Sequence, residues 1–194
     1  MNLKQLDNTL TLLRAQEILD FNLISLQIDG ERVFHAGHRA RSEMPQLRGF
    51  PRPNSIAARI PADDKGKVDV TREFLSFLEQ ESADGSFYKL TYGQVEAREL
   101  RSSQNELVAS KIAKHVGKME KDSDHRKFNQ TYIVSHDMRL LDGHHGWASV
   151  VVCDLLQESS THIYIVKVSS DIDTLVKLAR DFTNLVGIDT KQGL

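Results

Sequence analysis

The chain has 194 residues, of which 40 % are hydrophobic and 27 % charged, as is ordinary for a soluble globular protein with one domain, or with one domain and an arm. Its net charge of -2 excludes a bulk polyanion binder, and its single cysteine, Cys153, excludes an intrachain disulfide or a cysteine-rich metal site. No apolar run is long enough for a membrane helix, and the first residues show no signal-peptide pattern. We therefore expect a cytoplasmic protein without a membrane partner.

The chain begins with a predicted helix and hairpin. Leucines at helical spacing predict an amphipathic helix over 3–19. Alternating residues on either side of Asp29-Gly30 predict two strands joined by a two-residue turn.

An arginine-rich arm follows. All four prolines fall within 45–61, which indicates a long ordered arm rather than helix or sheet. Six arginines against two acids lie between 31 and 59. The arm could grip the phosphates of DNA or RNA, or it could pair with the acidic segment 61–85 or with a partner. We favour pairing.

Four helices and four strands are predicted beyond the arm. In chain order they are a helix that Asp69 begins and that includes Leu78, a strand within 86–92, a helix over 105–120, strands over 131–135 and 138–141, a helix over 144–157, a strand over 161–168 and a helix over 171–186 that ends at Gly187. Strands and helices mix without regular βαβ repetition, so we predict an α+β fold.

The stretch "LLDGHHGWAS" at 140–149 lies between a predicted strand and a predicted helix. A strand, a glycine turn and a helix start are the parts of an anion site, because the first N–H groups of a helix lack partners and glycine lets a phosphate approach the backbone. The alternatives are a metal site, or a helix start capped by Asp142 with His144 and His145 in solvent.

Two segments carry a resemblance. "TYIVSHDMRLLDGHHGWASVVV" and "ARELRSSQNELVASKIAKHV" resemble the two motifs of the ParB/sulfiredoxin superfamily, in particular its free-serine-kinase and phage-encoded branches. The resemblance covers about 95–168. It implies a small mixed sheet with packed helices over 94–194, preceded by an N-terminal extension over 1–93 that holds the first helix, the hairpin, the arm and a further helix.

The resemblance also implies a nucleotide site. ATP or another nucleotide, with Mg²⁺, would place its phosphates against Gly143 and His145. His144 stands where sulfiredoxins have a reactive cysteine, so sulfiredoxin chemistry is not expected. Gly146 stands where the family pattern usually has arginine, which removes a permanently charged clamp on phosphate and argues against an active enzyme unless Arg139 or Arg126 substitutes.

The predicted helix over 105–120 carries the other candidate residues. Lys111, Lys114 and Lys118 share one face, which is either a cationic wall around phosphates or a solvated surface, and the resemblance favours Lys111. Gln104 precedes this helix as a further nucleotide contact. Glu106 is either a favourable acid in the first turn or a catalytic base. Asp142 is either a helix cap or a carboxylate facing a metal ion.

Two functions remain open at this stage. The first is nucleotide binding in a phage or mobile-element protein, with ATPase or kinase-like phosphotransferase activity. The second is a catalytically inactive module of a virion or plasmid complex that binds DNA or protein through 31–61. Whether the chain is an enzyme, whether it forms a homo-oligomer, and whether it acts in a host cytoplasm or a virion are left open.

Overall fold

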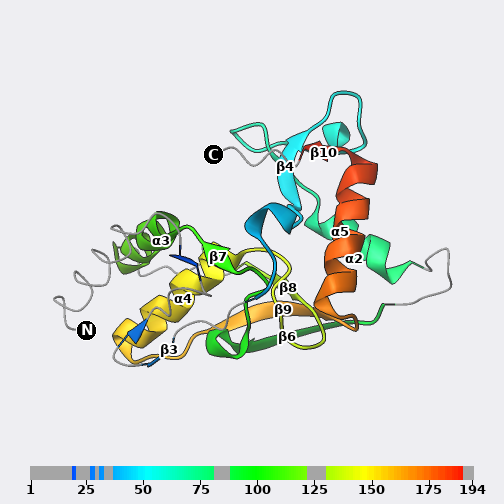
Figure 1. Ribbon diagram of the computed structural model, residues 1–194. Helices are drawn as coiled ribbons and strands as arrows, with labels where there is room; N and C mark the ends of the chain where they lie inside the picture. Colours follow the sequence, from blue (N-terminus) through cyan, green and yellow to red (C-terminus); the bar gives the residue numbers. More distant parts are fainter. Residues whose placement is uncertain are drawn as a thin grey trace.

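The computed structural model describes residues 37–80, 88–121 and 130–189, together with the backbone of three short strands at 19–20, 27–28 and 31–32 (Figure 1). The helix predicted over 3–19 lies outside the described residues, apart from its last residue. No described helix has the length and apolar character that crossing a membrane requires.

A three-stranded mixed sheet forms the centre of the fold. Strand β9 (His162–Val168) pairs antiparallel with β6 (Leu90–Glu96) and parallel with β8 (Tyr132–Val134), in the order β6-β9-β8. The predicted α+β class, with a small mixed sheet and packed helices, is confirmed. The strands predicted over 86–92, 131–135 and 161–168 are present with shifted ends.

Helix α4 (His144–Gln157) lies over one face of this sheet, and α3 (Ala109–Lys121) packs on α4, so that both helices share one core with the sheet (Figure 1). Alternation along β9 turns Ile163 and Ile165 toward α4, where Trp147 is 1 % exposed and donates from Nε1 to Ala97 O at 2.7 Å. The α4 bounds agree with the prediction. The single cysteine, Cys153, lies buried in this core.

Helices α2 (Thr71–Glu79) and α5 (Ile172–Val186) form a second core with the opposite face of the sheet, to which Ile133 and Val168 belong. Asp171 caps α5 by accepting from Thr174 N at 2.8 Å, and Gly187 ends the helix in the left-handed region at φ 82°. Both were predicted as its start and stop. Asp69 does accept from Thr71 N at 3.0 Å, although the residue that precedes α2 is Val70.

The arm was predicted to contain no helix or sheet. This prediction is wrong for the middle of the arm, which forms a strand. β4 (Arg48–Pro51) pairs with β5 (Val68–Asp69) and with β10 (Ile188–Asp189). Pro51 is tolerated because it ends the strand. Arm residues Met44 and Leu47 are buried in the second core beside α5.

The start of the predicted helix over 105–120 is also wrong. Residues 106–107 form β7 (Glu106–Leu107), which pairs with β1 (Leu19–Asp20), and α3 begins at Ala109. The expected strand over 138–141 makes only isolated bridges through Arg139 and Leu140. The predicted hairpin is confirmed by the pairing of β2 (Gln27–Ile28) with β3 (Glu31–Arg32), although its two turn residues lie outside the described part.

The division of the chain after residue 93 stays a prediction. That point falls inside β6, and α2 and the arm, which precede it, share a core with α5, which follows it. The two parts are packed together in the structure.

Candidate functional site

The turn that joins β8 to α4 requires glycine at position 143. Gly143 has φ 82°, a conformation that other residues adopt only with strain. A Cβ added there would lie 2.5 Å from Gln130 Nε2 and 2.9 Å from Tyr132 Cε1. Gly143, rather than Asp142, is the residue that precedes the helix, and Asp142 Oδ1 accepts from Gly143 N at 2.6 Å. The prediction that Asp142 is the helix cap is therefore wrong by one residue.

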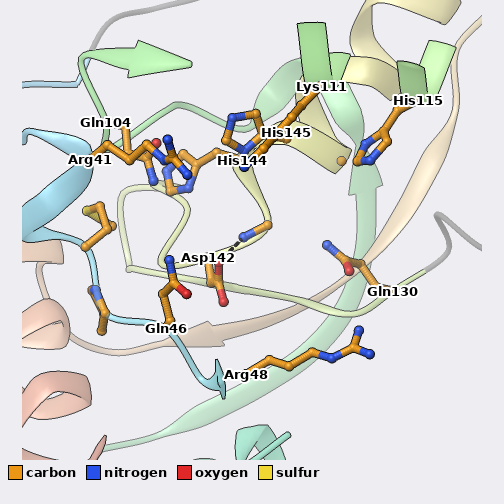
Figure 2. Close-up of a pocket in the computed structure, with 14 residues that line it drawn as sticks. Arg41, Gln46, Arg48, Gln104, Lys111, His115, Gln130, Asp142, His144 and His145 are labelled. Atoms are coloured by element: carbon orange, nitrogen blue, oxygen red, sulfur yellow. Dashed lines mark hydrogen bonds between the residues drawn. The ribbon is translucent and has the colours of Figure 1, made fainter. Parts of the chain in front are cut away.

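A cavity of about 420 Å³ lies in front of this turn, and we call it the α4 pocket. Three parts of the chain surround it: the first turn of α4, one side of α3, and the arm before β4 (Figure 2). Its lining residues are Arg41, Met44, Pro45, Gln46, Arg48, Gln104, Lys111, His115, Gln130, Asp142, Gly143, His144, His145 and Gly146. The structure thus brings together six of the predicted site residues, which are separated by up to 41 positions in the chain: Gln104, Lys111, Asp142, Gly143, His144 and His145.

The first turn of α4 lines the α4 pocket and carries backbone N–H groups that have no partner within the helix. Trp147 N is the first amide of the helix that bonds within it, to Gly143 O at 3.0 Å. The amides of His144, His145 and Gly146 precede it and have no intrahelical acceptor. The helix dipole adds partial positive charge at this end, so the turn favours an anion.

His145 is held as a neutral hydrogen-bond donor. The backbone N–H of Val108 donates to His145 Nε2 at 3.0 Å, so we assign the ring proton to Nδ1. Burial lowers the pKa of His145 to about 3, and the nearby positive charges of Lys111 and Arg41 act in the same direction. A neutral Nδ1–H can donate one hydrogen bond to an anion without a titration near neutral pH.

His144 is 2 % exposed and is anchored to the segment before β7. Ser103 N donates to its Nε2 at 3.3 Å, and Ser103 Oγ lies 2.8 Å from the same nitrogen. Its Nδ1 is buried and has no hydrogen-bond partner within the described part of the chain. Burial lowers the pKa of His144 to about 3. The alternative of two histidines in solvent is wrong, because Ser103 bonds the ring of His144 and Val108 bonds the ring of His145.

Cations from α3 and from the arm surround the α4 pocket. Lys111 lines it, and burial lowers the pKa of Lys111, with Arg41 contributing next. Lys114 and Lys118, predicted on the same face, are exposed and do not line the pocket. Arg48 lines the opposite side and forms an ion pair with Asp63.

The ion pairs of the arm agree only in part with the prediction from the sequence. Arg48 confirms the expected pairing with the acidic segment, whereas Arg39 pairs with Asp173 on α5. Arg41 and Arg48 line the pocket and were not predicted to do so. The excess of arginines in the arm was a signal of anion binding, but it did not indicate where these two side chains lie. Arg139, expected as a substitute for the missing arginine, instead bonds Asp137 and Ser102 O. Arg126 lies outside the described residues.

One polar side chain in the α4 pocket lacks the hydrogen-bond partner that burial usually requires. Gln104 is 7 % exposed, and its Oε1 has no hydrogen-bond partner within the described ranges. Such a group is expected to bond a ligand or water. Asp142 is exposed toward the pocket and already accepts from Gly143 N, and desolvation raises the pKa of its carboxyl group.

Gly146 has a packing role as well as a place in the pocket wall. A Cβ there would lie 3.2 Å from Tyr132 Oη, which is itself buried. Burial raises the pKa of Tyr132, so the hydroxyl stays protonated. The side chain of Gln130 acts on this pKa in the opposite direction, but Tyr132 Oη has no hydrogen-bond partner within the described residues. The glycine therefore accommodates a neighbouring side chain.

A protein-built metal site is not seen in the part of the chain that the structure describes, where no three His, Cys, Asp or Glu side chains converge. The side chain of Glu106 lies outside the described residues, so its predicted catalytic role stays a prediction. Asp142 is placed in the α4 pocket as a single carboxylate.

No family model, no curated protein and no solved structure matches the chain.

Proposed function

We propose that the α4 pocket binds the phosphates of a nucleotide. One observation carries the proposal: the first turn of α4, whose first amides have no intrahelical acceptor, borders the same cavity as His145 and the cations Arg41 and Lys111. Amides at a helix N-terminus and charged donors are the groups that recognise phosphate oxygens.

The number and kind of donors favour phosphate over a smaller anion. A carboxylate needs two or three donors, whereas this pocket offers three amides, an imidazole N–H and three cationic side chains. Arg41 supplies a planar cation in place of the arginine that the superfamily pattern carries at position 146. We therefore keep the proposed relationship to ParB/sulfiredoxin proteins. In this chain, the positive charge that the superfamily places at the start of the helix would come from the arm.

Mg²⁺ would enter with the phosphates. Magnesium in nucleotide sites is usually held by one or two carboxylates together with phosphate oxygens and water. Asp142 is the carboxylate of the α4 pocket that fits this role, and the amide oxygen of Gln104 is a second oxygen in the lining of the same pocket.

ATP hydrolysis or phosphoryl transfer to a hydroxyl is the activity that we propose for this site. Such reactions depend mainly on positioning and on neutralising phosphate charge, which Lys111 and Arg41 would supply. Glu106 would accept the proton of the attacking hydroxyl or water, as proposed from the sequence.

Calorimetric titration tests the binding. Wild type, His145→Ala and His136→Ala are each titrated with tripolyphosphate, ATP, CTP and GTP in the presence of Mg²⁺. We expect micromolar binding that His145→Ala weakens and His136→Ala leaves unchanged, because His136 is exposed and does not line the pocket. The absence of binding at millimolar ligand would refute the proposal.

The catalytic part needs its own measurement. Release or transfer of phosphate from ATP is followed in wild type, Glu106→Gln and His145→Ala. We expect both variants to lose most of the activity. Full activity in Glu106→Gln would exclude Glu106 as the catalytic base and would leave the proposed phosphate binding standing.

A further inference from the structure

A groove lies over part of one sheet face, beside the α4 pocket. Tyr92, Val166 and Ile133 lie in one row across β6, β9 and β8, because Val166 is in register with both of the others. The opposite wall is a face of α2 that includes Thr71 and Leu75. Between them lies a groove of about 590 Å³, the α2 groove, whose floor is apolar and whose open end holds Tyr92, 63 % exposed.

The α2 groove continues into the α4 pocket. A cavity of about 340 Å³ lies between them. It shares Asp69 and Ile133 with the groove, and Asp142 and Gly143 with the pocket. Tyr92 is two strands away from β8, which corresponds to about 10 Å at the usual strand spacing. A ligand with phosphates at α4 and an extended organic part can therefore occupy both.

Two carboxylates, Asp69 and Asp142, line the junction together with Arg48. The Asp69 carboxylate uses Oδ1 to accept from Thr71 N, which leaves its other oxygen for a ligand. Carboxylates of this kind bind the hydroxyl groups of ribose in nucleotide sites. Beyond them, the exposed ring of Tyr92 stands over the apolar floor, and aromatic rings stack with nucleobases.

We propose that the α2 groove binds the nucleoside part of the nucleotide, with the ribose hydroxyls on Asp69 and the base on Tyr92. This inference rests on the proposed function, since it presumes phosphates in the α4 pocket. It assigns a role to the N-terminal part of the chain, because α2 and Asp69 lie before residue 93 and outside the segment that resembles ParB/sulfiredoxin proteins.

Comparison of ATP with tripolyphosphate separates the nucleoside from the phosphates. Both are titrated, with Mg²⁺, into wild type, Tyr92→Ala and Tyr164→Ala of the full chain. Tyr164 is the matched control, because it is exposed on the same sheet face but does not line the groove. We expect Tyr92→Ala to weaken ATP binding roughly tenfold and to leave tripolyphosphate unchanged, whereas Tyr164→Ala affects neither.

Three results would overturn the inference. If wild type binds tripolyphosphate as tightly as ATP, or if Tyr92→Ala has no selective effect on ATP, the nucleoside does not occupy the groove, and the phosphate site stands. If neither ligand binds, the proposed function fails and the inference fails with it.

The ribose contact is tested separately with ATP and 2′-deoxyATP in wild type and Asp69→Asn. Asparagine keeps an oxygen for Thr71 N, so the start of α2 is preserved. We expect wild type to prefer ATP and Asp69→Asn to lose that preference. Equal affinities of wild type for the two nucleotides would overturn the role of Asp69.

Discussion

The backbone N–H of Val108 donates a 3.0 Å hydrogen bond to Nε2 of His145. This contact joins the segment before α3 to the first turn of α4, and it leaves the Nδ1–H of His145 as the group that can serve a ligand. Protonating the ring would break the contact and would place a cation beside Lys111 and Arg41. The neutral ring is therefore part of the architecture of the α4 pocket.

Acid should destabilise the protein through its buried histidines. The pKa values of His144 and His145 in the folded state are about 3, below the ordinary histidine value of about 6.5, so the unfolded state binds more protons as the pH falls. The stability conferred by the neutral rings is present above about pH 6.5 and is lost progressively below it. Between about pH 7.5 and pH 5, each ring should remove about 2 kcal/mol from the free energy of unfolding.

Urea denaturation at these two pH values, with wild type and His145→Asn, measures the effect. The variant should lose less stability on acidification than wild type. The carboxyl group of Asp142 acts in the opposite direction, since its raised pKa lets the folded state bind a proton first, and it is present in both proteins. Equal losses in the two proteins would contradict a buried neutral His145.

Gly143→Ala should destabilise the chain, whereas Gly117→Ala should stabilise it. Alanine at 143 must adopt φ 82° and place Cβ 2.9 Å from Tyr132, which costs at least about 1–2 kcal/mol. Gly117 lies in α3 with open space at the position of a Cβ, so alanine there should add about 0.5–1 kcal/mol. Thermal unfolding of both variants checks the prediction, and a neutral effect at 143 would exclude the described turn.

Gly146 and Tyr132 should be energetically coupled. In wild type, alanine at 146 meets Tyr132 Oη at 3.2 Å, which cancels the usual helical gain over glycine. In a Tyr132→Phe background the hydroxyl is absent, and Gly146→Ala should then stabilise by about 0.5–1 kcal/mol. A double-mutant cycle of unfolding free energies measures this difference. Strict additivity would mean that the glycine at 146 has no packing role.

Lys111→Ala should weaken tripolyphosphate binding roughly tenfold, because it removes a charged donor from the α4 pocket. Lys114→Ala is the matched control on the same helix, and its more distant charge should change the affinity only about twofold. Titrations at one fixed salt concentration compare the two. Equal losses would indicate a diffuse electrostatic attraction instead of a defined site.

The local parts of the fold could be predicted from the sequence, and the long-range contacts could not. Helix α4 was predicted with its observed bounds, because a glycine turn and an uninterrupted apolar helix define it locally. Strands β4 and β10 were missed because β10 is two residues long and their pairing joins positions 51 and 188. Neither segment has a periodic pattern that would predict this pairing.

The candidate site shows the same limit. The residues of the glycine turn were predicted together with Lys111 and Gln104, and they line one pocket. The contribution of Arg41 depends on arm residues such as Met44 being buried in the second core, which is a tertiary property. The covering of His144 by Ser103 is tertiary as well, so the solvated alternative could not be excluded from the sequence.

Amide chemical shifts test phosphate binding at α4 most directly. A ¹H–¹⁵N correlation spectrum is followed as tripolyphosphate is added to the full chain, and the amides of His144, His145 and Gly146 are compared with those of Ile172 and Asp173. The latter begin α5, which Asp171 already caps. The account predicts large, saturable downfield shifts in the first turn of α4 and small ones in α5. No shift, or equal shifts at both helices, would contradict a phosphate site at the start of α4.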